Sequence, residues 1–241
     1  NGFIISGNSV IENNTAVNGG GVFYQGDSSS NMTISESARI SGNTATGNGG
    51  GIYFKNKGTL TMNGGSITGN TATGDGGGVY FGGDIFSISG GVEINSNTKN
   101  SANNNVYLPT NKSITIAGAL TGSNPIGVTT EKTPDASNYV RIASGSKNYA
   151  APEKFSYEND STPVSATSQN NSTADLVVCQ HNWNSTWSSD LYSHWHECSI
   201  CKGKGDIAAH TYDQQVKTKA YEKSSATCLS GTTYYMSCVC G

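Results

Sequence analysis

The sequence predicts an all-β protein: a parallel β-helix with three short strands in each coil of about 27 residues, followed by a small Cys/His-rich module. Two observations lead to this prediction. A four-fold repeat fills residues 1–108, and all six cysteines and all four histidines lie between residues 179 and 240. We therefore assign residues 1–178 to the β-helix and residues 179–241 to Cys/His-rich modules, of which we expect two.

The repeat is most evident at an Asn-Thr pair, whose asparagine recurs at spacings of 29, 27 and 27 residues. An isoleucine stands three residues before each asparagine, and a Gly or Asn triplet and then an apolar triplet follow it. The asparagines are Asn14, Asn43, Asn70 and Asn97, the isoleucines are Ile11, Ile40, Ile67 and Ile94, and the apolar triplets begin at Val22, Ile52, Val79 and Val106. Because Gly and β-branched residues are poor helix formers, we interpret each copy as short strands joined by turns.

A third strand opens each later copy with an apolar, hydroxyl, apolar alternation, which directs one pair of side chains inward. These strands cover residues 32–34, 60–62, 86–88 and 114–116. A single copy cannot bury its apolar side, but coils stacked about 4.8 Å apart would bury it continuously. We expect the isoleucines, the first residues of the apolar triplets and the asparagines each to form a ladder. From residue 109 to residue 178 the repeat decays, and we expect irregular final coils and a cap.

The motifs "I-x-G-N-T-A" and "G-G-G-V-Y" resemble the repeats of adhesin-like and polymorphic outer-membrane-protein-like bacterial surface proteins. The resemblance covers roughly residues 1–130 and, with the usual crossover rule, implies a right-handed parallel β-helix. The same coil carries polysaccharide lyases, glycoside hydrolases and non-catalytic adhesins, so the resemblance indicates the fold more than the function.

Charge and hydropathy exclude some partners. A net charge of -3 with only two arginines provides no basic stripe for nucleic acid. No apolar run approaches eighteen residues, so we expect no membrane span in this chain. We also expect the chain to be a fragment, with its targeting signals elsewhere and its second Cys/His module cut at the C-terminus.

Carboxylates in the repeats are few, do not recur together in the aligned copies, and have no histidine among them before residue 181. Because acid/base cleavage of polysaccharides needs paired carboxylates, we expect the coil to be non-catalytic. The alternative is a carbohydrate-active β-helix enzyme, a polysaccharide lyase or glycoside hydrolase, with acids brought together near Asp75, Asp84 or Glu93.

The middle residue of each apolar triplet is aromatic, and alternation places it outward. These residues, Phe23, Tyr53, Tyr80 and Tyr107, would form an aromatic ladder along one sheet. Such a ladder would either stack on the sugar rings of a host or microbial surface glycan or only stabilise the coils through cross-strand contacts.

Residues 179–241 contain two related segments, each opening with His-x-aromatic and ending in a close cysteine pair. Cys198 and Cys201 form a Cys-x-x-Cys knuckle, which supplies two thiolates to a tetrahedral zinc ion. Candidates to complete this first zinc site are His181, His194 and His196, and candidates for a second site are His210, Cys228, Cys238 and Cys240. Cys179 is left over, and belongs to the first site or to a preceding module.

The pattern "H-W-x-x-C-x-x-C" resembles short Cys/His repeats at the C-terminal ends of large surface proteins of Gram-positive gut bacteria. The resemblance spans roughly residues 179–241 and implies a small structural metal module. Disulfides are the alternative, because six cysteines can pair completely in an extracellular protein. Taken together, the sequence favours a non-catalytic structural or adhesion segment on a bacterial cell surface, with a surface glycan or protein as its partner.

Overall fold

The computed structural model describes residues 2–168, 172–212, 222–224, 233–234 and 237–238 of the 241-residue chain. The chain divides into two compact units, Asn1–Gln180 and His181–Gly241. In the described residues, no helix has the length and apolar character needed to cross a membrane.

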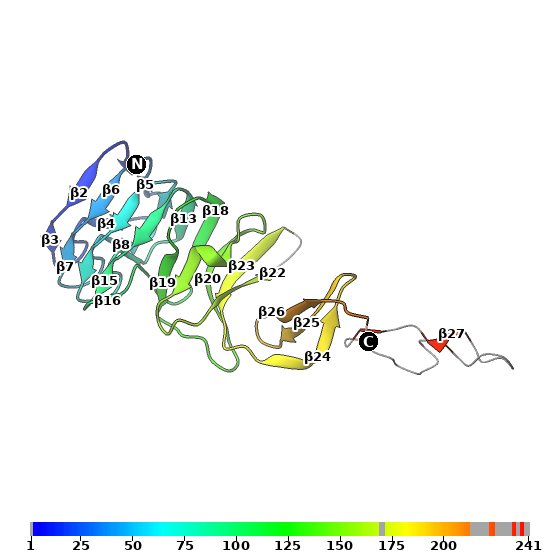
Figure 1. The fold of residues 1–241 in the computed structure, drawn as a ribbon. Coiled ribbons are helices and arrows are strands. Elements are labelled where there is room, and N and C mark those ends of the chain that lie inside the picture. Colours follow the sequence, from blue (N-terminus) through cyan, green and yellow to red (C-terminus); the bar gives the residue numbers. More distant parts are fainter. Residues whose placement is uncertain (1, 169–171, 213–221, 225–232, 235–236, 239–241) are drawn as a thin grey trace. The chain divides into compact units, whose positions relative to one another are not determined.

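The first unit is a parallel β-solenoid with turns of about 28 residues, which confirms the predicted fold class. Short strands of successive coils lie side by side and pair in register (Figure 1). Within the described residues they form four stacks, which we name sheets A to D. Sheet A contains, in spatial order, β1 (Gly2–Ile5), β5 (Asn31–Ile34), β9 (Thr59–Met62), β13 (Ile85–Gly90), β18 (Ile114–Leu120), β20 (Val140–Ser146), β23 (Thr173–Val178) and β22 (Val164–Ser168).

The other three stacks follow the same coils in the same order. Sheet B contains β2 (Val10–Glu12), β6 (Arg39–Ser41), β10 (Ser66–Thr68) and β14 (Glu93–Asn95). Sheet C contains β3 (Thr15–Ala16), β7 (Thr44–Ala45), β11 (Thr71–Ala72), β15 (Thr98–Lys99) and β16 (Ala102–Asn103). Sheet D contains β4 (Val22–Gly26), β8 (Ile52–Asn56), β12 (Val79–Phe81), β17 (Val106–Leu108), β19 (Ile126–Thr130) and β21 (Phe155–Tyr157).

The coil therefore has four short strands where the sequence analysis expected three. The segment from the isoleucine to the Asn-Thr pair bends between sheets B and C, and the residue before each asparagine adopts a positive φ. These residues are Asn13, Gly42, Gly69 and Ser96, with φ of 57°, 64°, 65° and 57°. A left-handed residue cannot continue a strand, so one short strand ends before it and another begins after it.

The predicted apolar ladders are confirmed by the strand registers. Ile11, Ile40, Ile67 and Ile94 pair in succession, and so do Val22, Ile52, Val79 and Val106. From the second coil on, these residues are almost completely buried. A row of aromatic rings, Phe54, Phe81 and Phe86, fills the same core with centroid separations of 5.4 and 5.2 Å. Stacking thus gives each coil the apolar contacts that a single coil lacks.

The asparagines form a continuous hydrogen-bonded ladder inside the bend. In each coil the side-chain oxygen accepts from both the backbone N–H and the side-chain amide of the asparagine one coil earlier. The ladder runs from Asn14 through Asn43, Asn70 and Asn97 to Asn105. It ends on the Glu158 carboxylate, which accepts from the backbone and side-chain amides of Asn105 at 2.8 and 2.6 Å. Buried amide groups are thereby satisfied across all of these coils.

The glycine triplets are required by close backbone approach between coils. A Cβ atom at Gly50 would lie 2.5 Å from the carbonyl oxygen of Thr71 in the next coil, and Gly20 and Gly77 are equally crowded. A side chain at the middle of the triplet would force the coils apart.

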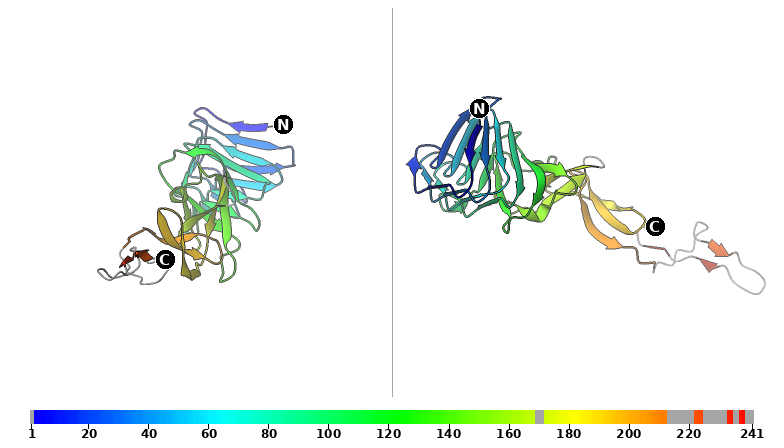
Figure 2. Two further views of the ribbon diagram at one scale, coloured as in Figure 1. Left: turned by 90° about the vertical axis from the view of Figure 1, so that its right-hand side faces the viewer. Right: turned by 90° about the horizontal axis from the view of Figure 1, so that it is seen from above.

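The parallel stack continues beyond residue 109 and then changes direction. β18 pairs with β20, and β19 with β21, in parallel. β23 and β22 then add to sheet A in antiparallel orientation, after the 3₁₀ turn η1 (Pro152–Lys154). Figure 2 shows the same sequence of stacked strands from two further sides.

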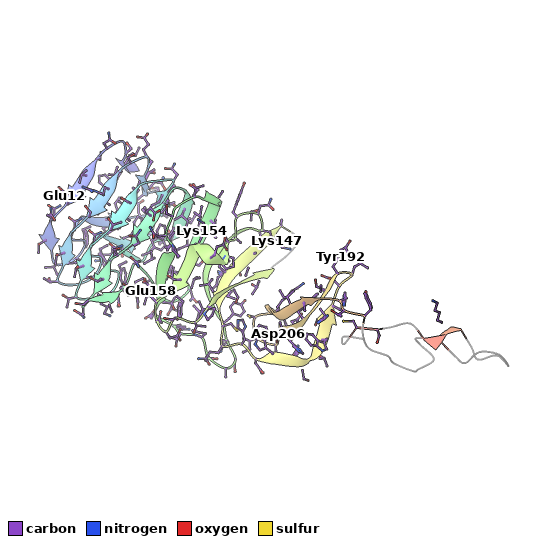
Figure 3. The ribbon with its side chains drawn as sticks, viewed as in Figure 1. Glu12, Lys147, Lys154, Glu158, Tyr192 and Asp206 are labelled. Atoms are coloured by element: carbon purple, nitrogen blue, oxygen red, sulfur yellow. The ribbon has the colours of Figure 1, made fainter. Side chains whose placement is uncertain are left out.

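The second unit has an antiparallel sheet of β24 (Trp183–Ser189), β25 (Ser193–Cys198) and β26 (Lys204–Ala209). Tyr192 lies in the turn that joins β24 and β25 (Figure 3). A short antiparallel pair, β27 (Glu222–Ser224) and β28 (Thr233–Tyr234), follows among the described residues.

Candidate metal centres

Four side chains form the first candidate metal centre: Cys179, His181, Cys198 and Cys201. One potential ligand atom from each lies within 4.8 Å of all the others. The three cysteines are buried and His181 is partly exposed. Three thiol groups and one imidazole are a donor set that zinc binds tetrahedrally in structural sites.

The knuckle begins at Cys198, the last residue of β25, and turns sharply back toward β26. The Cys198 N–H donates to the Gly203 carbonyl at 2.9 Å, and the Lys202 N–H donates to the Cys198 carbonyl at 3.0 Å. Lys202 has a φ of 60°. A Cβ atom at Gly203 would lie 3.2 Å from the Cys201 sulfur, so a glycine leaves room for both sulfurs inside the turn.

The environment of Cys198 favours the thiolate. Burial by itself raises the pKa of this thiol, but hydrogen bonds outweigh it and lower the pKa from 9.0 to about 6. These hydrogen bonds come from the Cys201 backbone, the His181 side chain, and the Ile200 and Asn182 backbones. The thiolate is the form that binds metal, so at neutral pH Cys198 is mostly in the ionisation state of a metal ligand.

His181 lies against the knuckle, with its Nδ1 atom 3.5 Å from the Cys201 sulfur. Its ring stacks on the indole of Trp183, with a centroid separation of 4.4 Å and an interplanar angle of 20°. Cys179, which the sequence analysis left over, is two residues before His181 and is the fourth member of the group. The Cys-x-His spacing is the signal in the sequence that could have identified it.

His194 and His196, the other two candidates for the first site, are not members of this group. Both lie on β25, where a rise of about 3.3 Å per residue places His194 roughly 13 Å and His196 roughly 7 Å from Cys198. His196 instead stacks on Trp187 at a centroid separation of 3.8 Å. Residues that are close in the sequence are separated here by the extended backbone.

His194 belongs to a second group, with His210 and Cys238, whose potential ligand atoms also lie within 4.8 Å of one another. The His194 Nδ1 atom is 3.2 Å from the Cys238 sulfur, and both residues are buried. Two of the residues predicted for the second site, His210 and Cys238, are therefore brought together. The other two, Cys228 and Cys240, lie outside the described residues.

The four aromatic residues of the predicted ladder stack along the outer face of sheet D. Neighbouring ring centroids from Phe23 through Tyr53 and Tyr80 to Tyr107 are 5.5, 4.9 and 5.3 Å apart. Phe23 is 48% exposed and the three tyrosines are half-buried. Burial, followed by the charges of Asp75 and Glu131 and by Tyr80, raises the pKa of Tyr107 to about 12, so this tyrosine is a neutral hydrogen-bond donor at neutral pH.

The three acids of the enzyme alternative each have structural partners. Asp75 forms an ion pair with Lys99 at 2.7 Å, Asp84 accepts from the Gly58 N–H at 3.0 Å, and Glu93 accepts from the Ser123 N–H at 2.5 Å.

A polar pocket of about 790 Å³ lies among the final coils. Its acids include Glu131, Asp135 and Asp175. Hydrogen bonds from Thr110 lower the pKa of Glu131, and those from Ser137 and Asn138 lower the pKa of Asp135. Asp175 lies 3.6 Å from Arg141 in an ion pair.

Comparisons of this chain with protein-family models, with curated proteins and with solved structures each find no match.

Proposed function

We propose that this chain is a non-catalytic structural segment of a bacterial extracellular surface protein: a solenoid spacer followed by a zinc-stabilised unit. The observation that carries the proposal is the use of the repeated polar residues. The repeated asparagines hydrogen-bond to their own copies in neighbouring coils, and the repeated glycines accommodate neighbouring backbones. These repeated residues bind neighbouring coils to one another. Few polar side chains of the repeat therefore remain for catalysis.

The carboxylates support the same proposal. A general acid needs a raised pKa beside a partner that stays ionised. In the pocket of the final coils, hydrogen bonds from Thr110 lower the pKa of Glu131, and hydrogen bonds within its own turn lower the pKa of Asp135. A pair of ionised acids with structural roles favours a spacer over the polysaccharide lyase or glycoside hydrolase alternative.

A structural zinc ion would give the second unit the core that it lacks. In the described residues of this unit, the buried side chains are Trp195, His194, Ser237, Cys198, Cys201 and Cys238. Trp195 is therefore the one large apolar group among them, and the others include most of the candidate ligands. Small domains with so little apolar burial commonly depend on a metal or on disulfides.

The first centre favours metal over disulfides. It brings together three cysteines, and a disulfide within this group can join only two of them. A zinc ion uses all three sulfurs and also uses His181, which a disulfide does not need.

The test is metal content with thiol counting on the chain purified without reductant or chelator. We expect bound zinc, with thiols that become reactive only after chelation. Cys198→Ser and Cys201→Ser should each lower the zinc content, whereas Ser199→Ala, in the same knuckle, should leave it unchanged. If neither zinc nor reactive thiols are found, the second unit is held by disulfides and not by a metal ion.

A glycan-binding surface is the second candidate function, and the outward aromatic ladder of sheet D favours it. Sugar rings pack on aromatic faces, and the half-buried tyrosines offer both ring surface and hydroxyl groups. If the ladder binds a surface glycan, Tyr53→Ala and Tyr80→Ala will lose hits on a glycan array. Tyr149→Ala, which removes an exposed aromatic ring outside the ladder, is the matched control. Retention of every hit by both ladder variants would assign the ladder to stacking alone.

The enzyme alternative is tested separately by incubating the chain with a panel of acidic and neutral polysaccharides. The spacer proposal expects no new reducing ends and no unsaturated products. Cleavage that disappears in Asp75→Asn, Asp84→Asn or Glu93→Gln would overturn it.

A further inference from the structure

We propose that His194, His210 and Cys238 bind a second zinc ion, which fastens the C-terminal stretch to the sheet formed by β24, β25 and β26. The ligands come from three separate places in the second unit. His194 lies on β25, His210 directly follows β26, and Cys238 lies beyond β28. The repeated sequence pattern suggested one site in each segment, whereas this centre draws ligands from both.

The three side chains converge in a largely buried position. The potential ligand atoms lie within 4.8 Å of one another, and the His194 Nδ1 atom is 3.2 Å from the Cys238 sulfur. His194 is 6% exposed and Cys238 is 4% exposed. Two imidazoles and one thiolate are suitable zinc ligands, and they leave a fourth tetrahedral position for water or a further thiolate.

His210 already has the second contact that is typical of a metal-ligating histidine. Its Nε2 atom is 2.8 Å from the Asp190 carbonyl oxygen. A histidine that donates one ring N–H to a carbonyl is fixed in orientation and keeps the lone pair of its other nitrogen for a metal. The Asp190 carboxylate in turn accepts from the Tyr192 and Ser193 N–H groups at 2.9 and 2.8 Å. These hydrogen bonds fix the β24–β25 turn and with it the position of the Asp190 carbonyl.

Trp187 supports the imidazole of His194. Its indole meets the His194 ring edge-on, with a centroid separation of 4.6 Å and an interplanar angle of 81°. The same indole stacks on His196, which points to no metal group. His196 is thus a close matched control: it is the same residue type, on the same strand and against the same tryptophan, but outside both centres.

The ion would join parts of the chain that are far apart in the sequence. His194 and Cys238 are 44 residues apart, and the described residues of this unit bury only one large apolar side chain. Metal binding energy then becomes folding energy for the C-terminal stretch.

The experiment measures zinc per chain by elemental analysis of the full chain and its variants. We expect two zinc ions in the wild type, and one in His194→Gln, in His210→Gln and in Cys238→Ser. His196→Gln should keep two. Cys198→Ser removes a ligand of the first centre only, so it should keep one. Two ions in either His194→Gln or Cys238→Ser would overturn the proposal, and so would a single wild-type ion that Cys198→Ser loses and His194→Gln keeps.

A second measurement locates the remaining ion. Tryptophan fluorescence, to which Trp187 contributes beside His194, is followed while zinc is added to chelator-treated Cys198→Ser chain, in which the first centre is impaired. We expect a saturable change that is absent when His194→Gln is added to that background and retained when His196→Gln is added. A signal that survives the loss of His194 would place the ion elsewhere and refute the second centre. This outcome is independent of the zinc proposed at Cys198 and Cys201.

Discussion

Asn70→Ala tests whether the buried asparagine ladder holds the coils together. Asn70 is completely buried in the middle of the ladder. Its side-chain oxygen accepts from the backbone and side-chain amides of Asn43, both at 2.9 Å. Its side-chain amide donates to the Ile40 carbonyl at 3.0 Å and to the Asn97 side-chain oxygen at 2.9 Å. Alanine removes all of these contacts and supplies none.

The magnitude follows from the groups left behind. The backbone N–H of Asn43 loses its acceptor in a site closed to water, which costs about 1–3 kcal/mol, whereas the Asn43 side-chain amide keeps the Ile11 and Ser41 carbonyls as acceptors. We therefore expect a loss of about 3 kcal/mol in the free energy of unfolding, before any contribution from the small cavity. Asn14→Ala is the matched control, because Asn14 is the exposed first member and its backbone N–H still reaches Asn43. Its cost should be about 1 kcal/mol or less.

The assay is urea unfolding followed by far-ultraviolet circular dichroism, with the slope compared between variants to confirm that the same structure unfolds. Equal losses in Asn70→Ala and Asn14→Ala would refute the reasoning. Such a result would mean that the apolar ladders alone set the stability of the coils.

Three further predictions concern single contacts of the solenoid. Gly50→Ala should destabilise by about 3 kcal/mol in urea unfolding, because its Cβ would lie 2.5 Å from the Thr71 carbonyl oxygen. Gly91→Ala, whose nearest neighbour is 3.7 Å away, should change stability by less than about 0.5 kcal/mol, and similar effects at both positions would contradict the packing argument. Burial raises the pKa of Glu158 above 4.5 despite the hydrogen bonds from Asn105. Protonation of Glu158 therefore favours the folded state. This stabilisation is present at low pH and is lost as pH rises through the raised pKa. The wild type should therefore lose stability relative to Glu158→Gln as pH rises above 4.5, and a stability difference that does not vary with pH would count against it. Lys99→Ala should lower the free energy of unfolding by less than about 1 kcal/mol, because both side chains of the ion pair with Asp75 are partly exposed. A urea midpoint shift as large as that of Gly50→Ala would contradict this estimate.

The candidate metal centres show how far sequence proximity can mislead. The run from His194 to Cys201 places two histidines next to the knuckle in the sequence, and this made them candidates to complete it. The extended conformation of β25 separates them from Cys198, and Cys179 and His181 reach the knuckle from the chain that precedes β24. His194 becomes available to a second group that includes Cys238, 44 residues away. No spacing rule within one segment identifies such a group.

The repeat, by itself, determined the architecture of the first unit. Equal spacing of Ile, Asn, Gly and aromatic residues puts like residues in register as soon as the coils stack, so the ladders followed from the sequence alone. The tertiary structure decided what local pattern could not encode. The positive φ at Asn13, Gly42, Gly69 and Ser96 separates the short strands of sheets B and C, which gives four strands per coil and not three, and Glu158 ends a ladder that begins at Asn14. Both metal groups likewise depend on which distant segments the folded chain brings together, because a coordination site is set by distances between side-chain atoms and not by their order in the sequence.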